Sequence, residues 1–337
     1  MVASAYVESF AKLSGRMRLT GVLATSQARG QVFLAEHAAR FPQARAFADL
    51  SDLVESRPDM AVVITPPNAR LAIVDALARH KIPILMEKPV ERSLGAAQHL
   101  VDLCHGAGVP LGIVLQHRVR PSAQRLHSLL EQQDFGTLHL VEISVPWWRA
   151  QSYYDQPGRG TLARDGGGVL ISQAIHTLDL ALQFTGPVRE VMAMVRTSGL
   201  HRLEAEDFVS AGLGFECGAS GSLIASTATY PGRTEEIILH YDRASVTLRS
   251  SELVVDWHTG QTDRFGSLQA TGAGGDPMAF TADWHQAVIA DFLDCLDTGQ
   301  TPVASGQSAL GVHALIEAII VSGATQSLAH VQKVAFQ

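Results

Sequence analysis

The alternation of apolar runs with helical patterns over the first 118 residues constrains the fold of this chain most. We predict strands at 18–24, 44–47, 60–65, 84–87 and 111–115, and helices at 3–13, 31–40, 51–55, 71–80 and 96–105. The run 60–65 is apolar and β-branched, as expected for a strand that is buried on both faces. Strands and helices that alternate at this spacing form a parallel sheet with right-handed crossovers. Residues 1–118 are therefore predicted to form a Rossmann-type, doubly wound α/β domain.

Residues 119–337 follow a different pattern. Period-two segments with turn residues between them lie at 138–147, 207–215, 220–228, 235–240, 245–249 and 253–257. Helical patterns lie at 122–132, from Gly168 to about 184, at 281–297 and at 308–322. Closely spaced strands of this kind favour antiparallel pairing. We predict an α+β domain with a large, mostly antiparallel sheet, and we interpret the Gly-, Thr- and Ser-rich stretch 260–276 as a mobile loop.

Composition excludes several classes of function. With 337 residues, 46% of them hydrophobic and 18% charged, the chain can bury a substantial core. The net charge is -7 and no basic cluster is interleaved with aromatic residues, which argues against a nucleic-acid partner. No apolar run reaches the length of a membrane span, and we find no signal peptide. Three distant cysteines (Cys104, Cys217, Cys295) fit neither a disulfide framework nor a zinc site. We expect a cytoplasmic protein without a metal.

The sequence Glu87-Lys88-Pro89 ends the apolar run that begins at residue 84. Because Pro89 cannot continue a sheet ladder, Lys88 lies at the carboxyl end of a strand, where ligands bind in open α/β sheets. A partly desolvated lysine there would have a lowered pKa and could exchange a proton with a substrate hydroxyl. The alternative is a surface lysine at the end of a strand, and this motif alone leaves both interpretations open.

Three motifs together resemble the glucose–fructose oxidoreductase / inositol dehydrogenase / rhizopine catabolism (Gfo/Idh/MocA) family over essentially the whole chain. They are Thr65-Pro66-Pro67 followed by a helix and Glu87-Lys88-Pro89, then Gln116-His117-Arg118, and the glycine-rich run from Gly166 through Ser172, Gln173 and His176 to Asp179. The resemblance implies a dinucleotide-binding domain, a sheet domain and an active site between them. It also implies hydride transfer between C4 of a nicotinamide and a sugar or cyclitol carbinol.

By this resemblance, Lys88 contacts substrate and cofactor, and His176 is the acid/base at the reacting hydroxyl. Hydride leaves carbon as a proton leaves oxygen, so a titratable group and a nearby ammonium suit the reaction. An isolated helix histidine would more often simply bind a backbone carbonyl. Family members often carry an aspartate four residues before the histidine, where this chain has Ser172, a neutral hydroxyl on the same helix face. Asp179 either orients the imidazole or caps local polar groups, and both interpretations stay open.

The family's opening strand and Gly-x-Gly-x-x-Gly turn are not found in this sequence. We expect roughly ten further residues before Met1, forming an apolar strand that leads into that turn. The cofactor contacts expected within the chain are Thr25, Ser26, Arg29, Thr65, Pro66, Pro67, Asn68, Glu87 and Lys88. NAD enzymes place an acid at the end of the second strand, whereas this chain has hydroxyls and Arg29 there. This favours NADP, with NAD as the alternative, unless these residues merely cap the next helix.

The segment before the glycine-rich helix is dense in aromatic residues and arginine. Aromatic faces suit a pyranose ring, and arginine suits a carboxylate or phosphate. We predict substrate contacts from Gln116, Arg118, Arg149, Tyr153, Tyr154, Ser172, Gln173 and Asp179. An anionic or nucleotide-linked sugar, or another hydroxy- or oxo-acid, would fit them. The alternative interpretation is a loop that packs against another subunit.

Two functions are compatible with the sequence. The first is an NAD(P)-dependent oxidoreductase that acts on a small-molecule substrate and assembles as a homodimer or homotetramer. The second is a catalytically silent, dinucleotide-binding regulatory or scaffold protein on the same fold. The presence of Lys88 and His176 favours the enzyme, and the glycine turn that was not found keeps the second hypothesis open.

Overall fold

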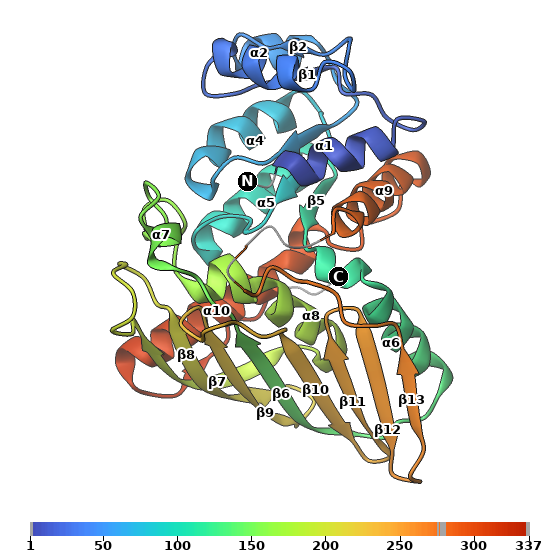
Figure 1. The fold of residues 1–337 in the computed structure, drawn as a ribbon, viewed down its shortest axis with the longest axis vertical. Helices are drawn as coiled ribbons and strands as arrows, with labels where there is room; N and C mark the ends of the chain where they lie inside the picture. Colours follow the sequence, from blue (N-terminus) through green and yellow to red (C-terminus); the bar gives the residue numbers. More distant parts are fainter. Residues whose placement is uncertain (1–2, 275, 277–280, 335–337) are drawn as a thin grey trace.

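The computed structural model describes residues 3–274, 276 and 281–334, and it confirms the predicted fold class. Figure 1 shows a part with small parallel strands and helices above a large twisted sheet. The first hundred residues form most of the upper part, and helix α9, drawn in orange, returns to it from late in the chain.

The parallel strands form two separate sheets. Strand β1 (Gly21–Val22) pairs with β2 (Arg45–Ala46). Strands β3 (Ala61–Val63), β4 (Ile84–Glu87) and β5 (Leu111–Val114) form the second sheet in that order. No strand among the described residues pairs with both β1 and β3. The strand predicted at 18–24 is only two residues long, since its ladder has a partner on one side alone. Strands β3 and β4 pair in parallel, so their carboxyl ends lie side by side.

The helices begin largely where the sequence supplies caps. Ser26, Asp49, Ser93 and Ser305 each accept a hydrogen bond from the backbone N–H three residues later. The helices are α1 (Ala3–Lys12), α2 (Gln27–Glu36), α3 (Leu50–Glu55), α4 (Arg70–Arg79), α5 (Leu94–Ala107), α6 (Pro121–Gln132), α7 (Gln151–Tyr154), α8 (Ile175–Thr185), α9 (Asp283–Thr298) and α10 (Gly306–Thr325). Short turns are η1 (Pro67–Ala69), η2 (Gln116–Val119) and the π-helical η3 (Leu170–Ala174).

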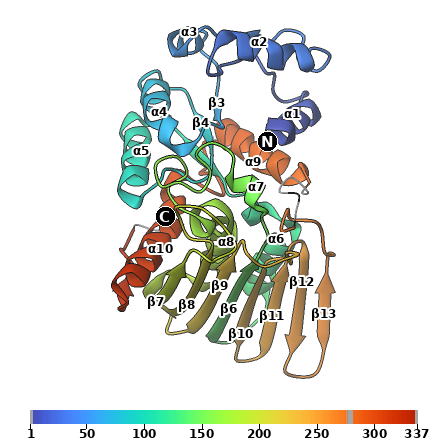
Figure 2. The same cartoon turned by 60° about the vertical axis from the view of Figure 1, so that its left-hand side comes forward.

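The large sheet has nine strands in the order β13-β12-β11-β10-β6-β9-β8-β7-β14. They are β6 (Leu138–Pro146), β7 (Val188–Arg196), β8 (Phe208–Phe215), β9 (Ser220–Ser226), β10 (Glu236–Tyr241), β11 (Ala244–Arg249), β12 (Glu252–Trp257), β13 (Thr262–Phe265) and β14 (Ala329–His330). Only β6 and β9 pair in parallel. Helices α6, α8 and α10 pack on one face of this sheet (Figure 2).

Three strands, β7, β13 and β14, were missed by the sequence prediction. Strand β13 lies inside the stretch 260–276 that was predicted to be a mobile loop, so that prediction is wrong for residues 262–265. It is a short polar strand at the edge of the sheet, where packing does not demand an apolar pattern. In β7, a register shift between Val188 and Glu190 breaks the period-two pattern.

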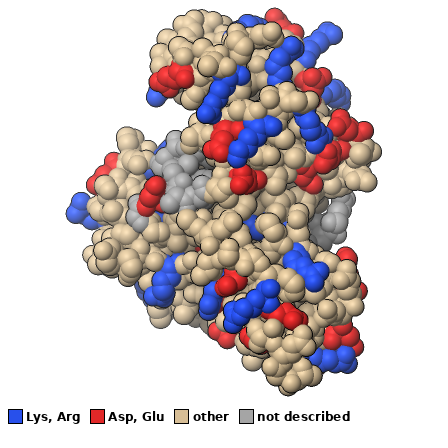
Figure 3. Space-filling view, turned by 45° about the vertical axis from the view of Figure 1, so that its right-hand side comes forward, with Lys and Arg blue, Asp and Glu red and all other residues tan. Residues whose placement is uncertain are grey.

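Among the described residues, one helix is long and apolar enough to cross a membrane by length and composition alone. This helix is α10, which has a mean hydropathy of 1.5 over an 18-residue window. That window is 67% buried, because the helix packs between α5 and β7. A core helix has the same composition. On the face shown in Figure 3, acidic and basic side chains are interspersed over the surface.

Candidate active site

A cleft of about 410 Å³ lies where the carboxyl ends of β3 and β4 meet the glycine-rich helix start. The side chains that line it are Ile64, Thr65, Pro66, Pro67, Arg70, Glu87, Lys88, Pro89, Gln116, His117, Trp147, Arg149, Tyr153, Arg159, Arg164, Asp165, Ser172, Gln173, His176, Thr271, Trp284 and His285. They come from both parts of the fold. The volume is in the usual range for a small-molecule site.

A buried arginine fixes the two strand ends to each other. Arg70, at the start of α4, donates to Thr65 O at 2.8 and 3.0 Å and to Glu87 O at 2.6 Å, and it also contacts Pro89 O. Burial lowers the pKa of Arg70 to about 10, so it stays cationic at neutral pH. It therefore holds the strand ends that present Thr65 and Lys88 to the cleft.

Lys88 reaches across the cleft to the glycine-rich helix. Its Nζ donates to the carbonyl of Ser172 at 2.6 Å, within the π-helical turn η3. Such turns occur often at functional sites. Burial lowers the pKa of Lys88 to about 8; the charge of Glu87 opposes this shift, and the Arg159 charge adds to it. The ammonium and the neutral amine are thus both accessible near physiological pH.

Glu206 caps the start of the glycine-rich helix, and its backbone leaves no room for a side chain at Gly168. The carboxylate of Glu206 accepts from Gly168 N and Leu170 N, both at 3.0 Å. A Cβ on Gly168 would lie 1.7 Å from Glu206 O, so a larger residue cannot be accommodated without displacing the backbone at Glu206, just before β8. The cap fixes η3 and, one turn later, the position of His176.

His176 lies in the cleft with 6% of its surface exposed. Its ring stacks on that of His117, with centroids 4.9 Å apart and planes at 29°. Burial, and then the charges of Lys88 and Arg120, hold the pKa of His176 well below its usual value. The imidazole is therefore neutral at pH 7 and can accept a proton. Its Nδ1 has no hydrogen-bond partner among the described residues.

His117 was missed as a site residue, although the sequence analysis singled out its neighbours on both sides. Its Nε2 contacts the guanidinium of Arg120, which can only donate, so Nε2 accepts and the proton lies on Nδ1. That Nδ1–H is buried without a partner among the described residues. Arg120 itself pairs with Glu235 at 2.8 Å and lies 4.2 Å from the centroid of the Trp284 ring. His117 is thus a fixed hydrogen-bond donor beside His176.

Glu87 is held by residues from the two ends of the chain. Tyr6 donates to its Oε1 at 2.8 Å, and His285 Nε2 lies 3.6 Å from the same oxygen. Burial raises the pKa of Glu87, but the hydrogen bond and charge of His285, with the charge of Lys88, outweigh it and lower the pKa overall. No sequence signal marks Tyr6 or His285, since only the packing of α1 against α9 brings them here.

The structure brings together most of the residues predicted from sequence. Those that line the cleft are Lys88, His176, Gln116, Arg149, Tyr153, Ser172, Gln173, Thr65, Pro66, Pro67 and Glu87. Gln173 also donates to the Tyr153 hydroxyl at 3.3 Å.

The other predicted residues lie outside the cleft lining. Arg118 and Asp179 form a buried ion pair at 2.6 Å, so Asp179 contacts Arg118 in place of the His176 ring. The hydroxyl of Tyr154 bonds Thr227 at 2.5 Å. At the end of β1, Thr25, Ser26 and Arg29 are exposed, and Ser26 caps α2. Asn68 is exposed on η1.

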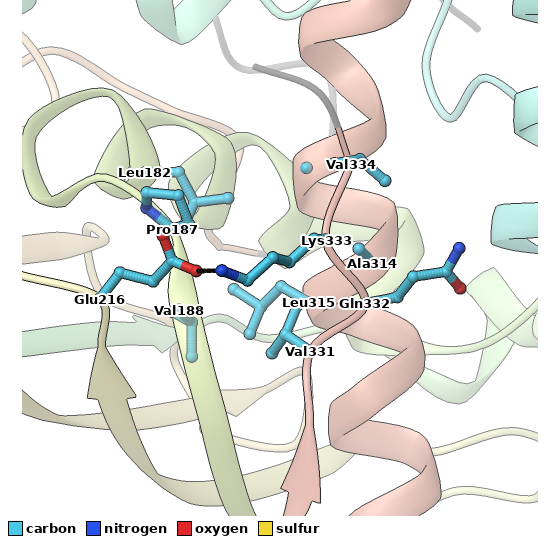
Figure 4. A pocket seen from close by; sticks show the side chains of 11 residues that line it. Leu182, Pro187, Val188, Glu216, Ala314, Leu315, Val331, Gln332, Lys333 and Val334 are labelled. Carbon is cyan, nitrogen blue, oxygen red and sulfur yellow. Dashed lines mark ion pairs between the residues drawn. The ribbon is translucent and has the colours of Figure 1, made fainter.

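A second cavity, of about 80 Å³, lies between the end of α8, the start of β7, α10 and the segment after β14 (Figure 4). Its lining is mostly apolar, and its charged residues Lys333 and Glu216 pair with each other at 3.1 Å. Among the described residues, no group of three His, Cys, Asp or Glu side chains could bind a metal ion.

Two family profiles match the chain. Residues 1–114 match the oxidoreductase family with an NAD-binding Rossmann fold, and residues 123–247 match the GFO/IDH/MocA C-terminal domain. D-apiose dehydrogenase of Rhizobium rhizogenes is 27% identical over 276 residues, which are 79% of this chain and 77% of that protein. Myo-inositol dehydrogenase Hyg17 of Streptomyces leeuwenhoekii is 25% identical over 271 residues, 77% of this chain and 76% of that protein.

Solved structures resemble this chain over nearly its whole length. The WlbA dehydrogenase from Bordetella pertussis, in complex with NADH and UDP-GlcNAcA, aligns with a TM-score of 0.82 and 26% identity, covering 99% of this chain and 95% of that chain. Levoglucosan dehydrogenase, in complex with NADH and levoglucosan, aligns with a TM-score of 0.82 and 19% identity, covering 99% and 97%. The second likeness is one of fold.

Proposed function

Because the chain belongs to the Gfo/Idh/MocA family of oxidoreductases, we propose that it is an NAD(P)-dependent dehydrogenase acting on a CH–OH group of a sugar, a cyclitol, or an acidic or nucleotide-linked sugar derivative. The observation that carries this proposal is that Lys88 and His176, from different parts of the fold, line one cleft as a cation and a neutral base. A catalytically silent scaffold would need no such pair, so this arrangement disfavours the second hypothesis.

The cleft offers polar atoms that suit a nicotinamide nucleotide. Thr65 Oγ1 and Gln116 Oε1 are buried there without a partner among the described residues. Unpaired buried groups are costly, and a ribose hydroxyl or a carboxamide would satisfy them. We assign Thr65, Pro66, Pro67, Glu87 and Lys88 to the cofactor side. When bound, the nicotinamide supplies the hydride acceptor at C4.

In the oxidation direction, neutral His176 accepts the proton of the substrate carbinol. The ammonium of Lys88 stabilises the negative charge that develops on the same oxygen. Because Lys88 is tied to the Ser172 carbonyl, its position is fixed before substrate arrives. His117 Nδ1–H is placed to donate to a substrate oxygen beside His176.

The function is tested by following NAD(P)H absorbance with a panel of D-apiose, myo-inositol, levoglucosan and UDP-linked and free uronic acids. We expect at least one to be oxidised at a rate that depends on Lys88 and His176. Failure of the purified protein to bind either NADH or NADPH would contradict the proposal.

For cofactor choice, we expect NADPH to bind more tightly than NADH. No acid follows β1, and exposed Arg29 lies at the start of α2, where it can bind a 2′-phosphate. Arg29→Ala should weaken NADPH binding roughly ten-fold, the equivalent of 1.4 kcal/mol, and leave NADH unchanged. Fluorescence titration measures both. Tighter binding of NADH than of NADPH by the unaltered protein would overturn this prediction.

We also infer a homodimer or homotetramer. The sheet face opposite the helices carries large apolar side chains that are at least half exposed, namely Leu140, Met192, Met194 and Ile224. Exposed apolar patches of this kind mark protein–protein contacts. Light scattering after gel filtration should give a particle mass that is a multiple of the chain mass. The double variant Met194→Lys, Ile224→Lys should lower this mass toward that of the monomer. A monomeric mass for the unaltered chain at micromolar concentration would contradict the inference.

A further inference from the structure

The candidate active-site cleft is strongly cationic within an acidic protein. Its lining contains Arg70, Lys88, Arg149, Arg159 and Arg164, but only two carboxylates, Glu87 and Asp165. The whole chain has a net charge of -7, so this concentration of positive charge is local. A cleft lined by one sign of charge attracts ligands of the opposite sign.

Several of these charged groups already have partners in the protein. Arg70 binds backbone carbonyls, and Lys88 binds Ser172 O. Arg164 donates to Pro157 O at 3.0 Å and lies 3.9 Å from Asp165. Asp165 in turn accepts from Gly160 N at 2.9 Å. These contacts account for Arg70 and Arg164 as parts of the framework, and Lys88 already belongs to the proposed catalytic pair.

Arg149 and Arg159 have donor atoms left over. The Nε of each is buried without a hydrogen-bond partner among the described residues. Arg149 is only 3% exposed, and its Nη1 is held by Trp148 O at 2.7 Å and Gly274 O at 3.0 Å. Because Nη1 is occupied, the Nε edge of the guanidinium remains for a ligand. That edge presents parallel N–H groups that match a carboxylate or phosphate.

The two guanidinium groups lie around one aromatic ring. Arg159 is 5.0 Å and Arg149 is 5.7 Å from the ring centroid of Tyr153, and Arg149 is 5.2 Å from that of Trp147. Burial lowers the pKa of Arg149, and Arg159 adds to this effect, while the charge of Asp276 opposes it. Two cations beside the same ring are both stabilised when an anion binds next to them.

We infer that Arg149 and Arg159 form an oxyanion subsite, so that the substrate carries a carboxylate or a phosphate in addition to its reacting carbinol. The inference rests on the proposed function and narrows its substrate class to anionic sugars. The hydroxyl groups of a neutral sugar or cyclitol can accept from the Nε–H groups, but they leave the two positive charges uncompensated, which is costly in a buried site.

Calorimetric titration of the protein with its preferred reduced cofactor tests the inference. The probes are D-glucose, D-glucuronate and UDP-glucose. We expect at least one anionic probe to bind ten-fold or more tightly than D-glucose. Preference for D-glucuronate identifies a carboxylate, and preference for UDP-glucose identifies a diphosphate. If neither anion binds more tightly than D-glucose, the inference is overturned.

Variants assign the effect to the pair. Arg149→Met and Arg159→Met should each reduce binding of the preferred anion at least ten-fold and change D-glucose binding less than two-fold. Arg164→Met is the matched control, because Arg164 lines the same cleft but is already paired. An equal loss in all three would indicate a general charge effect and would overturn the assignment. Arg159 is only partly buried, so its variant still tests the subsite if Arg149→Met fails to fold.

These outcomes are separable from failure of the proposed function. The titration measures binding and needs no turnover. Anion binding that depends on the two arginines, in a protein that binds neither NADH nor NADPH, would refute the dehydrogenase and retain the subsite. If the protein binds the cofactor and oxidises only a neutral sugar, the dehydrogenase is retained and the oxyanion subsite is refuted.

Discussion

Replacement of His176 by alanine is expected to lower kcat about 10²–10⁴-fold, the usual contribution of a general acid/base. The imidazole is neutral at pH 7 because burial and nearby cations hold its pKa down, so it is ready to accept the carbinol proton. Steady-state kinetics on the substrate found by the panel would measure the loss. Cofactor affinity should be unchanged, because the substitution removes the proton-transfer group and leaves the nucleotide contacts in place.

The control for this variant is His105→Ala. His105 is exposed on α5, away from the cleft, and its loss should leave kcat near that of the unaltered protein. Circular dichroism would show that both variants fold. If His176→Ala kept kcat within a few-fold of the original value, another group would have to carry the proton.

Replacement of Lys88 by alanine is expected to lower kcat by a similar factor, about 10²–10⁴-fold, through loss of electrostatic stabilisation. The pKa of about 8 adds a pH signature. Lys88 is cationic below that pH and neutral above it. Oxidation should therefore fall as the pH rises through about 8, because a neutral amine cannot stabilise the developing alkoxide.

Lys88→Arg separates the effect of the positive charge at this position from the effect of the contact to Ser172 O. Arginine stays protonated throughout the range, so the remaining activity of this variant should not fall between pH 7 and 9. Its longer, planar head group cannot reproduce the contact to Ser172 O, so its rate at pH 7 should still be reduced. An undiminished alkaline fall in Lys88→Arg would assign that pKa to another group.

The residues that could be predicted from sequence lie in short local motifs. Glu87-Lys88-Pro89 marks a strand end by the chemistry of proline, and the glycine-rich run marks a helix start that tolerates no side chain at Gly168. Both signals are local, since a few consecutive residues contain the whole pattern. The alternation of strands and helices predicted the fold class for the same reason.

The residues that could not be predicted depend on contacts between distant segments. Trp284 and His285 reach the cleft, and Tyr6 reaches Glu87, only because α1 and α9 pack together, more than 250 residues apart in sequence. Arg118 and Asp179 sit in motifs that point to the site, yet they bind each other. Sequence spacing predicts which face of a helix a residue lies on. It does not predict which polar groups pair with each other in the folded protein.

Helix α9 makes the two parts of the fold interdependent. Its Val288, Ile289 and Phe292 complete a core with Tyr6 and Leu13 of the first segment and with Leu85 and Val114 of β4 and β5. Ion pairs from Lys12 to Asp283 and from Arg16 to Asp294 and Asp297 flank that core.

A fragment that ends at residue 118 would therefore lack part of its own interior. Helix α9 also carries Trp284 and His285 into the cleft, so one wall of the cleft is attached to the first half of the fold. The polypeptide passes between the two halves more than once. We therefore expect relative motion of the halves to be a sliding of packed helices and not a rotation about a single linker.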